Sequence, residues 1–296
     1  MGTNKVAYLG PEASFTHLAS KALFQDELLV PTRTIPECIE AVANGSVDIA
    51  VVPLENALEG TVPLTIDYLF HEANLYVIAE IQVPIEQHLM VHPNNEKNWE
   101  EIKTIYSHPH ALAQCHKYLY YRFGKVPLEQ STSTAAAAKY VSENEELCIA
   151  AIGNSSAASE YNLAIVEHNI HDFHFNHTRF FVLSQKNHCI QKSGHIDQIK
   201  TTIMITLPKD DRSGALHQVL SVFAWRQLNL SKIESRPLKT GLGQYFFVMD
   251  VLEDEKMPMM IGAIEELKAL GCDVKSLGSY NTYETEKKEE ADTKGY

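Results

Sequence analysis

The sequence has little positive charge. Its 296 residues include 25 Lys and Arg against 38 Asp and Glu, so the formal net charge is −13. Nucleic acids and anionic membranes are bound by clustered Lys and Arg, and no stretch combines such a cluster with aromatic residues. The composition therefore argues against both partners. It leaves a small anionic substrate open, because a few local donors can outweigh a diffuse negative charge.

Long apolar runs and paired cysteines are also lacking. No run approaches the roughly 20 residues that a membrane-spanning helix needs, and the N-terminus reaches Pro11 and Glu12 before any apolar run long enough for a signal peptide. The five cysteines lie far apart without a C-x-x-C pair, which fits reduced thiols better than disulfides or structural zinc. We therefore expect a soluble, cytoplasmic protein without a membrane partner.

The familiar cofactor and catalytic motifs are missing as well. The chain has no G-x-x-x-x-G-K-[ST], G-x-G-x-x-G or H-E-x-x-H pattern and no nucleophile elbow. Four histidines (His168, His171, His174 and His177) recur at three-residue spacing. On a helix, neighbouring members could share a metal, but the surrounding phenylalanines and the apolar run that follows predict an irregular loop. We expect no metal and no cofactor.

The first 184 residues alternate between short apolar runs and helical patterns. Runs at 6–9, 48–56, 75–81, 105–106 and 147–152 predict strands, and segments at 15–24, 35–43, from 61 onward, 110–123, 135–141 and after 154 predict helices. This alternation is typical of an α/β domain with mostly parallel sheets.

The predicted strand-to-helix junctions are rich in small polar residues. They include Ser14, Asn56, Thr61, Ser107, Ser133, Thr134, Asn154 and Ser155. In parallel sheets such helix N-termini gather at the carboxyl edge, where their free N–H groups and positive dipole ends favour a small anion. The alternative is that Ser, Thr and Asn are simply the preferred helix caps.

From residue 185 the pattern changes. Residues 185–199 are polar and predict a linker, and residues 200–281 follow the order β-α-β-β-α-β, the split-βαβ, ferredoxin-like arrangement. Residues 282–296 are rich in charge and poor in aliphatic side chains, which predicts a disordered tail.

The stretch NHTRFF at 176–181 places a hydroxyl, a guanidinium and two aromatic rings before an apolar run. On a regular strand Thr178 and Arg179 point to opposite faces, so both reach one ligand only if the strand begins after them. Arg179 could grip a carboxylate or form a structural salt bridge. Glu55, beside Asn56 at a predicted strand end, could line a cleft or make a capping or hinge hydrogen bond.

Five motifs together resemble the prephenate dehydratase family over nearly the whole chain from Lys5 to about Tyr280. They are GPEASFTH at 10–17, PLENALEG at 53–60, SHPHAL at 107–112, STAAA at 133–137 and NHTRF at 176–180. The C-terminal region resembles an ACT regulatory domain, with GALH at 214–217 and ESRP at 234–237 matching its phenylalanine-binding motifs. Ala13, Ala57, His110 and His217 depart from a usual glycine, serine, glutamine and valine.

The resemblance implies a fold and a reaction. The catalytic domain would have two lobes like a type II periplasmic binding protein, with lobe one at 1–79 and 162–184 and lobe two at 80–161. The enzyme would convert prephenate to phenylpyruvate under feedback control by L-phenylalanine, as a homodimer or homotetramer. Arogenate dehydratase and a non-catalytic amino-acid sensor are the alternatives.

The resemblance also assigns residues. Thr178 would hydrogen-bond the leaving hydroxyl, and Phe180 would form an apolar wall against the ring. The expected substrate-binding set is Arg179, Phe180, Glu55, Asn56, Ser14, Phe15, Thr16, Ser107, His108, Ser133, Thr134 and Asn154. The expected effector-binding set is Gly214, Ala215, Leu216, Asn229, Leu230, Glu234, Ser235, Arg236 and Pro237.

Overall fold

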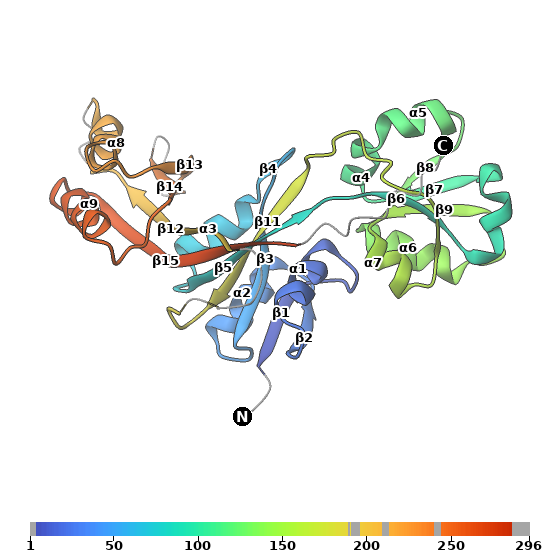
Figure 1. Ribbon diagram of the computed structural model, residues 1–296, viewed down its shortest axis with the longest axis horizontal. Helices are drawn as coiled ribbons and strands as arrows, with labels where there is room; N and C mark the ends of the chain where they lie inside the picture. The colour runs from blue at the N-terminus through green and yellow to red at the C-terminus, as the bar shows by residue number, and fades with distance from the viewer. Residues whose placement is uncertain (1–3, 189, 191–195, 209–212, 240–243, 286–296) are drawn as a thin grey trace.

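The computed structural model describes residues 4–188, 190, 196–208, 213–239 and 244–285. Three bodies follow one another along its long axis (Figure 1). The C-terminal domain lies at one end, the N-terminal lobe in the middle and a second lobe at the other end. No helix among the described residues is long and apolar enough to cross a bilayer.

Lobe one is built on five main strands in the order β5-β11-β3-β1-β2. Their bounds are β1 (Lys5–Leu9), β2 (Leu28–Thr32), β3 (Ile49–Asn56), β5 (Tyr76–Pro84) and β11 (His177–Ser184), and β4 (Gly60–Thr61) adds to β3. β1 is parallel to β2 and β3, whereas β11 runs antiparallel to both of its neighbours. The expected parallel core is therefore interrupted by one strand that returns from the other lobe.

The two faces of this sheet are covered by different helices. α1 (Phe15–Leu23) packs with Phe180 and Val182 of β11 in one core. α2 (Ile35–Ala43) and α3 (Pro63–His71) pack with Phe181 and Leu183 in another. Because side chains alternate along a strand, β11 contributes alternate residues to the two cores.

Lobe two contains a second sheet in the order β10-β6-β9-β7-β8. The strands are β6 (His88–Val91), β7 (Thr104–Ser107), β8 (Leu128–Gln130), β9 (Ile149–Gly153) and β10 (Ala164–Glu167). Around them lie the 3₁₀ segment η1 (Pro93–Glu101) and the helices α4 (Pro109–Gln114), α5 (His116–Phe123), α6 (Thr134–Glu143) and α7 (Ser155–Glu160). The helix predicted at 110–123 is thus two helices, which meet at Cys115.

The chain crosses between the lobes at 85–87 and returns at 168–176, so the predicted crossing points at 80 and 162 are wrong. β5 stays paired with β11 as far as Pro84, which keeps residues 80–84 in lobe one. β10 pairs with β6, which keeps residues 164–167 in lobe two. Strand pairing, which the sequence does not display, determines both boundaries.

The C-terminal domain has the predicted ferredoxin-like order. Its elements are β12 (Ile196–Thr206), α8 (Ala215–Trp225), β13 (Leu230–Pro237), β14 (Tyr245–Val251), α9 (Pro258–Ala269) and β15 (Asp273–Glu284). The antiparallel strand order is β13-β14-β12-β15. β12 begins inside the predicted linker, and residues 282–284 of the predicted tail belong to β15. Residues 286–296 of that tail lie outside the described residues.

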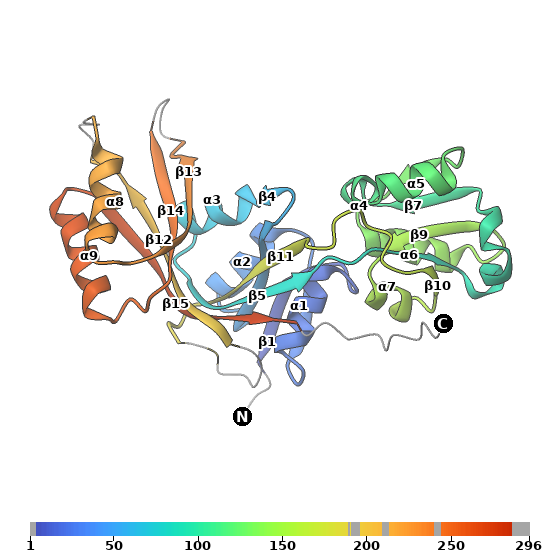
Figure 2. The same cartoon turned by 45° about the horizontal axis from the view of Figure 1, so that its top comes forward.

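The C-terminal domain and lobe one share one continuous sheet. The end of β15 pairs in parallel with β5, from Asn281 opposite Ala79 to Glu284 opposite Gln82. This pairing produces a ten-stranded sheet that runs from β13 to β2, and Figure 2 shows β15 passing from one domain into the other. Thr282 and Tyr283 are consequently buried, which a disordered tail would not allow.

Candidate active site

Thr178 lies at the start of β11, directly after the chain returns from lobe two. It pairs with Asn56 at the end of β3, and the Asn56 Nδ2 atom donates to Thr178 Oγ1 at 2.9 Å. On its other side Thr178 pairs with Val83, a member of the core beneath α1. Only 9% of Thr178 is exposed. The hydroxyl therefore belongs to the α1 face of the sheet, at the edge nearest lobe two.

Phe180 occupies the same face but does not line an open surface. It is 1% exposed and packs with Tyr8, Val51 and Ile81 in the core under α1. Its expected contact with a substrate ring is therefore not available in this structure. Phe180 instead anchors the strand that carries Thr178.

The polar helix termini that the sequence singled out are largely capping residues. The side chains of Ser14, Ser133 and Asn154 accept hydrogen bonds from backbone N–H groups of α1, α6 and α7, and His108 does the same for α4. Thr61 is an exception, because it lies in β4 and the cap of α3 is Val62. Phe15 and Thr16 form the first turn of α1, and Thr134 begins α6.

Ser107 is not placed for a ligand. It is fully buried, and its hydroxyl donates to the carbonyl of Ile152 at 2.7 Å. The hydroxyl thus ties β7 to β9 within lobe two. The sequence alone could not separate this internal hydrogen bond from an exposed one at a strand end.

Both sides of the junction between the lobes are held by polar contacts. Asn154 Nδ2 in lobe two donates to the carbonyl of Ala13 in lobe one at 2.9 Å. Gln114 Nε2 donates to Glu59 Oε1 at 3.3 Å, and His110 forms an ion pair with the same carboxylate. The loops before α1 and after β3 therefore both touch lobe two, which brings Asn56 and the N-terminus of α1 to the junction.

Arg179 lies on the opposite face of β11 from Thr178. Its guanidinium contacts Glu55 at 2.7 Å, Glu80 at 2.5 Å and Asp250 at 2.7 Å, and the side chain is 17% exposed. Lys200 contacts Glu80, and Lys232 contacts Glu55. We call these six side chains the Arg179 cluster. Because Asp250, Lys200 and Lys232 belong to the C-terminal domain, the cluster joins the two domains.

This placement corrects the expectation that Arg179 and Glu55 line one site with Thr178. β11 begins at His177, so both Thr178 and Arg179 lie within the strand and alternate in direction. Burial by itself would raise the pKa of Glu80, but Arg179 and Lys200 outweigh it and hold that pKa below its usual range. Burial opposes the charge of Arg179, and the carboxylates of Glu80 and Asp250 raise its pKa. These contacts therefore favour the charged forms of Glu80 and Arg179.

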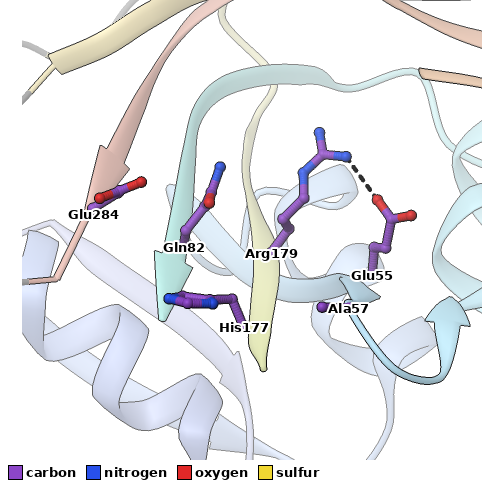
Figure 3. A pocket seen from close by; sticks show the side chains of 6 residues that line it. All are labelled: Glu55, Ala57, Gln82, His177, Arg179 and Glu284. Atoms are coloured by element: carbon purple, nitrogen blue, oxygen red, sulfur yellow. Dashed lines mark hydrogen bonds and ion pairs between the residues drawn. The ribbon is translucent and has the colours of Figure 1, made fainter. Parts of the chain in front are cut away.

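A pocket of about 360 Å³ opens on the Arg179 face. It is lined by Glu55, Ala57, Gln82, His177, Arg179 and Glu284 (Figure 3). Figure 3 shows Gln82 and Arg179 side by side on neighbouring strands, with Glu55 beyond and paired to Arg179. Thr178 does not line this pocket, so the cavity and the catalytic candidate are on different faces of the sheet.

Histidines hold the two crossing segments together. His88 Nδ1 accepts from the N–H of Asn169 at 3.1 Å, and His171 Nδ1 accepts from the N–H of Gln87 at 3.3 Å. Burial lowers the pKa of His88 to about 4 and also lowers the pKa of His171. The segment 168–176 is irregular, as predicted. Among the described residues no group of three His, Cys, Asp or Glu side chains could hold a metal.

Comparison with known proteins places the chain among enzymes of one kind. The family model for prephenate dehydratase matches residues 6–188. The prephenate dehydratase of Bacillus subtilis is 55% identical over 283 residues, which cover 95% of this chain and 99% of the relative. The chain belongs to the prephenate dehydratase family. Membership makes it a carbon–oxygen lyase with the two-lobed, periplasmic-binding-protein-like catalytic fold of that family.

Two solved structures resemble most of the chain, each with a TM-score of 0.80. One is a prephenate dehydratase from Arthrobacter aurescens in complex with L-Phe, which is 32% identical and is matched over 93% of this chain and 89% of the other. The second is GqqA, described as a novel type of quorum quenching acylase, which is 26% identical over 94% of this chain and 98% of the other.

Ala13 stands where the resemblance leads us to expect glycine. Its φ angle is 60°, in the left-handed region that glycine reaches without steric cost. The methyl group is fully buried in the lobe-two core beside Ala135 and Ala157. A favourable apolar contact thus accompanies an unfavourable backbone conformation at Ala13.

Two of the residues expected to bind an effector, Glu234 and Arg236, make side-chain contacts outside the C-terminal domain. Glu234 accepts from the Thr61 hydroxyl at 2.5 Å, and Arg236 makes a bidentate contact with Asp67 of α3 at 3.0 Å. Both therefore face lobe one. Among the other residues expected to bind the effector, four are largely exposed: Gly214, Asn229, Ser235 and Pro237. The remaining three, Ala215, Leu216 and Leu230, are partly buried.

Proposed function

We propose that this chain converts prephenate to phenylpyruvate. The substrate dianion loses its ring carboxylate as carbon dioxide, the freed electron pair enters the ring, and the C–O bond to the ring hydroxyl breaks to release hydroxide. Aromatisation supplies the driving force, so the protein needs to position the dianion and stabilise the departing oxygen. The Thr178 hydroxyl, held by Asn56 at the edge of the lobe-one sheet nearest lobe two, is the observation that supports this assignment.

The substrate is proposed to lie between the lobes on the α1 face. Part of the expected substrate-binding set lies near this face. It comprises Asn56, the first turn of α1 with Phe15 and Thr16, and the N-termini of α4, α6 and α7 in lobe two. Helix termini supply N–H groups and positive dipole ends for the two carboxylates. Arg179 and Glu55 are excluded from this set because they serve the cluster on the other face.

A direct assay tests this function. The purified chain should form phenylpyruvate from prephenate, detected by its absorbance in alkali, and should turn over arogenate more slowly. Faster turnover of arogenate would reassign the chain as an arogenate dehydratase. Binding of prephenate without product would identify a sensor and overturn the proposal.

An acylase function, as described for GqqA, is less well supported by the geometry. Acyl transfer through Thr178 would require a general base within hydrogen-bond reach of its hydroxyl. The side chain found there is the amide of Asn56, which donates and cannot remove a proton. Incubation with N-acyl homoserine lactones should therefore release no free lactone amine.

Feedback inhibition by L-phenylalanine through the C-terminal domain forms part of the proposal. The ACT assignment explains the GALH and ESRP motifs, and the relative from Arthrobacter aurescens was solved with L-Phe. β13 is the last strand of its sheet and exposes Ile233 and Ser235, so a second copy could pair along it in a homodimer or homotetramer.

The proposed location of the enzyme is the cytoplasm. Four described cysteines are free, and reduced thiols are typical of that compartment.

The Arg179 cluster offers a physical route for that regulation. Effector binding that shifts β13 or β14 would move Lys232 or Asp250, both of which contact groups on the strands beside Thr178. Titration of turnover with L-phenylalanine tests the regulation. Unchanged turnover at millimolar L-phenylalanine, with the dehydratase assay intact, would reject the regulatory part alone.

A further inference from the structure

The hydrogen bond between Asn56 and Thr178 has a defined direction. Asn56 Oδ1 accepts from the backbone N–H groups of Leu58 at 2.9 Å and Glu59 at 3.2 Å. Backbone N–H groups only donate, so this atom must be the oxygen. The other amide atom, 2.9 Å from Thr178 Oγ1, is then the nitrogen. Thr178 accepts from Asn56 and cannot donate to it.

The proton of the Thr178 hydroxyl is consequently left for another partner. A hydroxyl has one proton and two lone pairs, and the Asn56 amide occupies one lone pair. Within the part of the chain that the structure describes, the Asn56 amide is the hydrogen-bond partner of this hydroxyl, and it takes no proton. An amide that donates to a hydroxyl oxygen also polarises the O–H bond and strengthens it as a donor.

We infer that Asn56 is a positioning residue that sets Thr178 as a hydrogen-bond donor toward the leaving hydroxyl. Asn56 acts through Thr178, and it does so because its own oxygen is locked by the loop at 57–60. This inference rests on the proposed dehydration, in which charge develops on the departing oxygen and a preorganised donor lowers the barrier. It differs from the expectation that Asn56 binds the substrate itself.

The test reverses the polarity of position 56. In Asn56→Asp, one carboxylate oxygen still accepts from Leu58 and Glu59, so the loop is preserved. The other oxygen takes the Thr178 proton and turns lone pairs toward the substrate. We expect kcat to fall about 10- to 100-fold, within the range for loss of one preorganised donor, with KM changed less than about threefold. Asn56→Ser keeps a short acceptor for the loop, but its single oxygen lies one bond closer to the backbone than the Asn56 amide atoms and cannot occupy the positions of both Oδ1 and Nδ2. This variant should therefore also lose kcat.

The pH profile provides a readout that a merely structural role would not move. As the pH falls toward the pKa of the new carboxyl group in Asn56→Asp, protonation gives that side chain a donor again, so the kcat of the variant relative to the wild type should rise. The double variant with Thr178→Ala should be no slower than Thr178→Ala alone, within about threefold. Asn56 is proposed to act only through the Thr178 hydroxyl, so once that hydroxyl is gone a change at position 56 has nothing further to remove. Leu64→Asp, which adds the same charge at an exposed position of lobe one, should retain normal kcat.

Several results would overturn the inference. The first is a folded Asn56→Asp or Asn56→Ser variant with normal kcat. The second is a variant in which KM rises while kcat is unchanged. The third is a double variant whose reduction in kcat equals the product of the reductions in the two single variants. Circular dichroism establishes folding, and if Asn56→Asp does not fold, Asn56→Ser decides. Normal turnover by Thr178→Ala would instead reject the role proposed for Thr178 itself, so the two failures are distinguishable.

Discussion

Thr178 and Arg179 are adjacent in β11 but lie on opposite faces of the sheet, in different surroundings. On the α1 face, Thr178 meets one neutral amide and keeps its proton uncommitted. On the other face, Arg179 is surrounded by three carboxylates, two of them almost fully buried. Residues that are adjacent in a sequence motif such as NHTRF therefore need not belong to the same binding site. Neighbouring residues of a strand point to opposite faces of the sheet, and here the proposed catalytic hydroxyl lies on one face and the domain interface on the other.

The largest expected effect on stability comes from removing the charge of Arg179. Arg179→Leu would leave Asp250 buried without its cation and Glu80 with Lys200 alone, and breaking a buried charge pair in this way typically costs about 3–5 kcal/mol. Urea unfolding should show this loss. Arg122→Leu is the matched control, since Arg122 pairs with Glu100 at an exposed surface and should cost less than about 1 kcal/mol. Equal losses in the two variants would contradict the structural role of the cluster.

The next effect concerns the other face. Thr178→Ala should lower kcat about 100- to 1,000-fold, the usual result of removing one preorganised donor, while the unfolding midpoint in urea stays near that of the wild type. Thr178→Ser keeps the hydroxyl and should recover most of the rate. A Thr178→Ala enzyme that turns over prephenate normally would place the chemistry elsewhere.

A third prediction uses the crossing segments that hold β11 in place. The pKa of His88 is about 4 in the folded chain against an ordinary 6.5, so the unfolded state takes up the proton first. About 3 kcal/mol of stability is therefore present above the ordinary pKa and lost as the pH falls toward the folded one. Unfolding measured from about pH 7.5 to 4.5 should show this decline.

His88→Asn separates this effect from general acid sensitivity. Asparagine can accept from the N–H of Asn169 at any pH, so the variant should lose part of the pH dependence. His116→Asn, at an exposed position, should retain it. An identical decline in all three proteins would show that His88 is not responsible.

The smallest effect tests how the domains communicate. Arg236→Ala removes the bidentate contact with Asp67, worth about 1–2 kcal/mol for a partly buried charged pair. We expect normal kcat without effector and several-fold weaker inhibition by L-phenylalanine. Arg226→Ala, which breaks a pair with Glu266 inside the C-terminal domain, is the control and should leave inhibition unchanged if the interface transmits the signal.

Much of the fold can be predicted because local patterns dominate it. The sequence predicts α2 at its observed bounds, and β3 nearly so, since their apolar spacing and their turn residues agree. The pairing of β15 with β5 could not be predicted, because residues 282–284 carry no apolar pattern of their own. Their order comes from a neighbouring strand distant in the sequence, which no local pattern records.

The site divides in the same way. The catalytic role of Thr178 is a prediction from the NHTRF signature, and the direction of Arg179 follows from alternation once the start of the strand is known. The burial of Phe180 and Ser107 could not be foreseen, because it depends on the side chains that pack against them. The partners of Arg179 come from β3, β5 and β14, three strands that only the tertiary structure brings together.

A crystal structure with a bound, unreactive prephenate analogue tests the division between the two faces most directly. The account predicts that the ring hydroxyl, or its mimic, lies about 3 Å from Thr178 Oγ1, with Asn56 still donating to that oxygen and Arg179 still on Glu55, Glu80 and Asp250. A ligand carboxylate bound to Arg179 in place of those three side chains would contradict it.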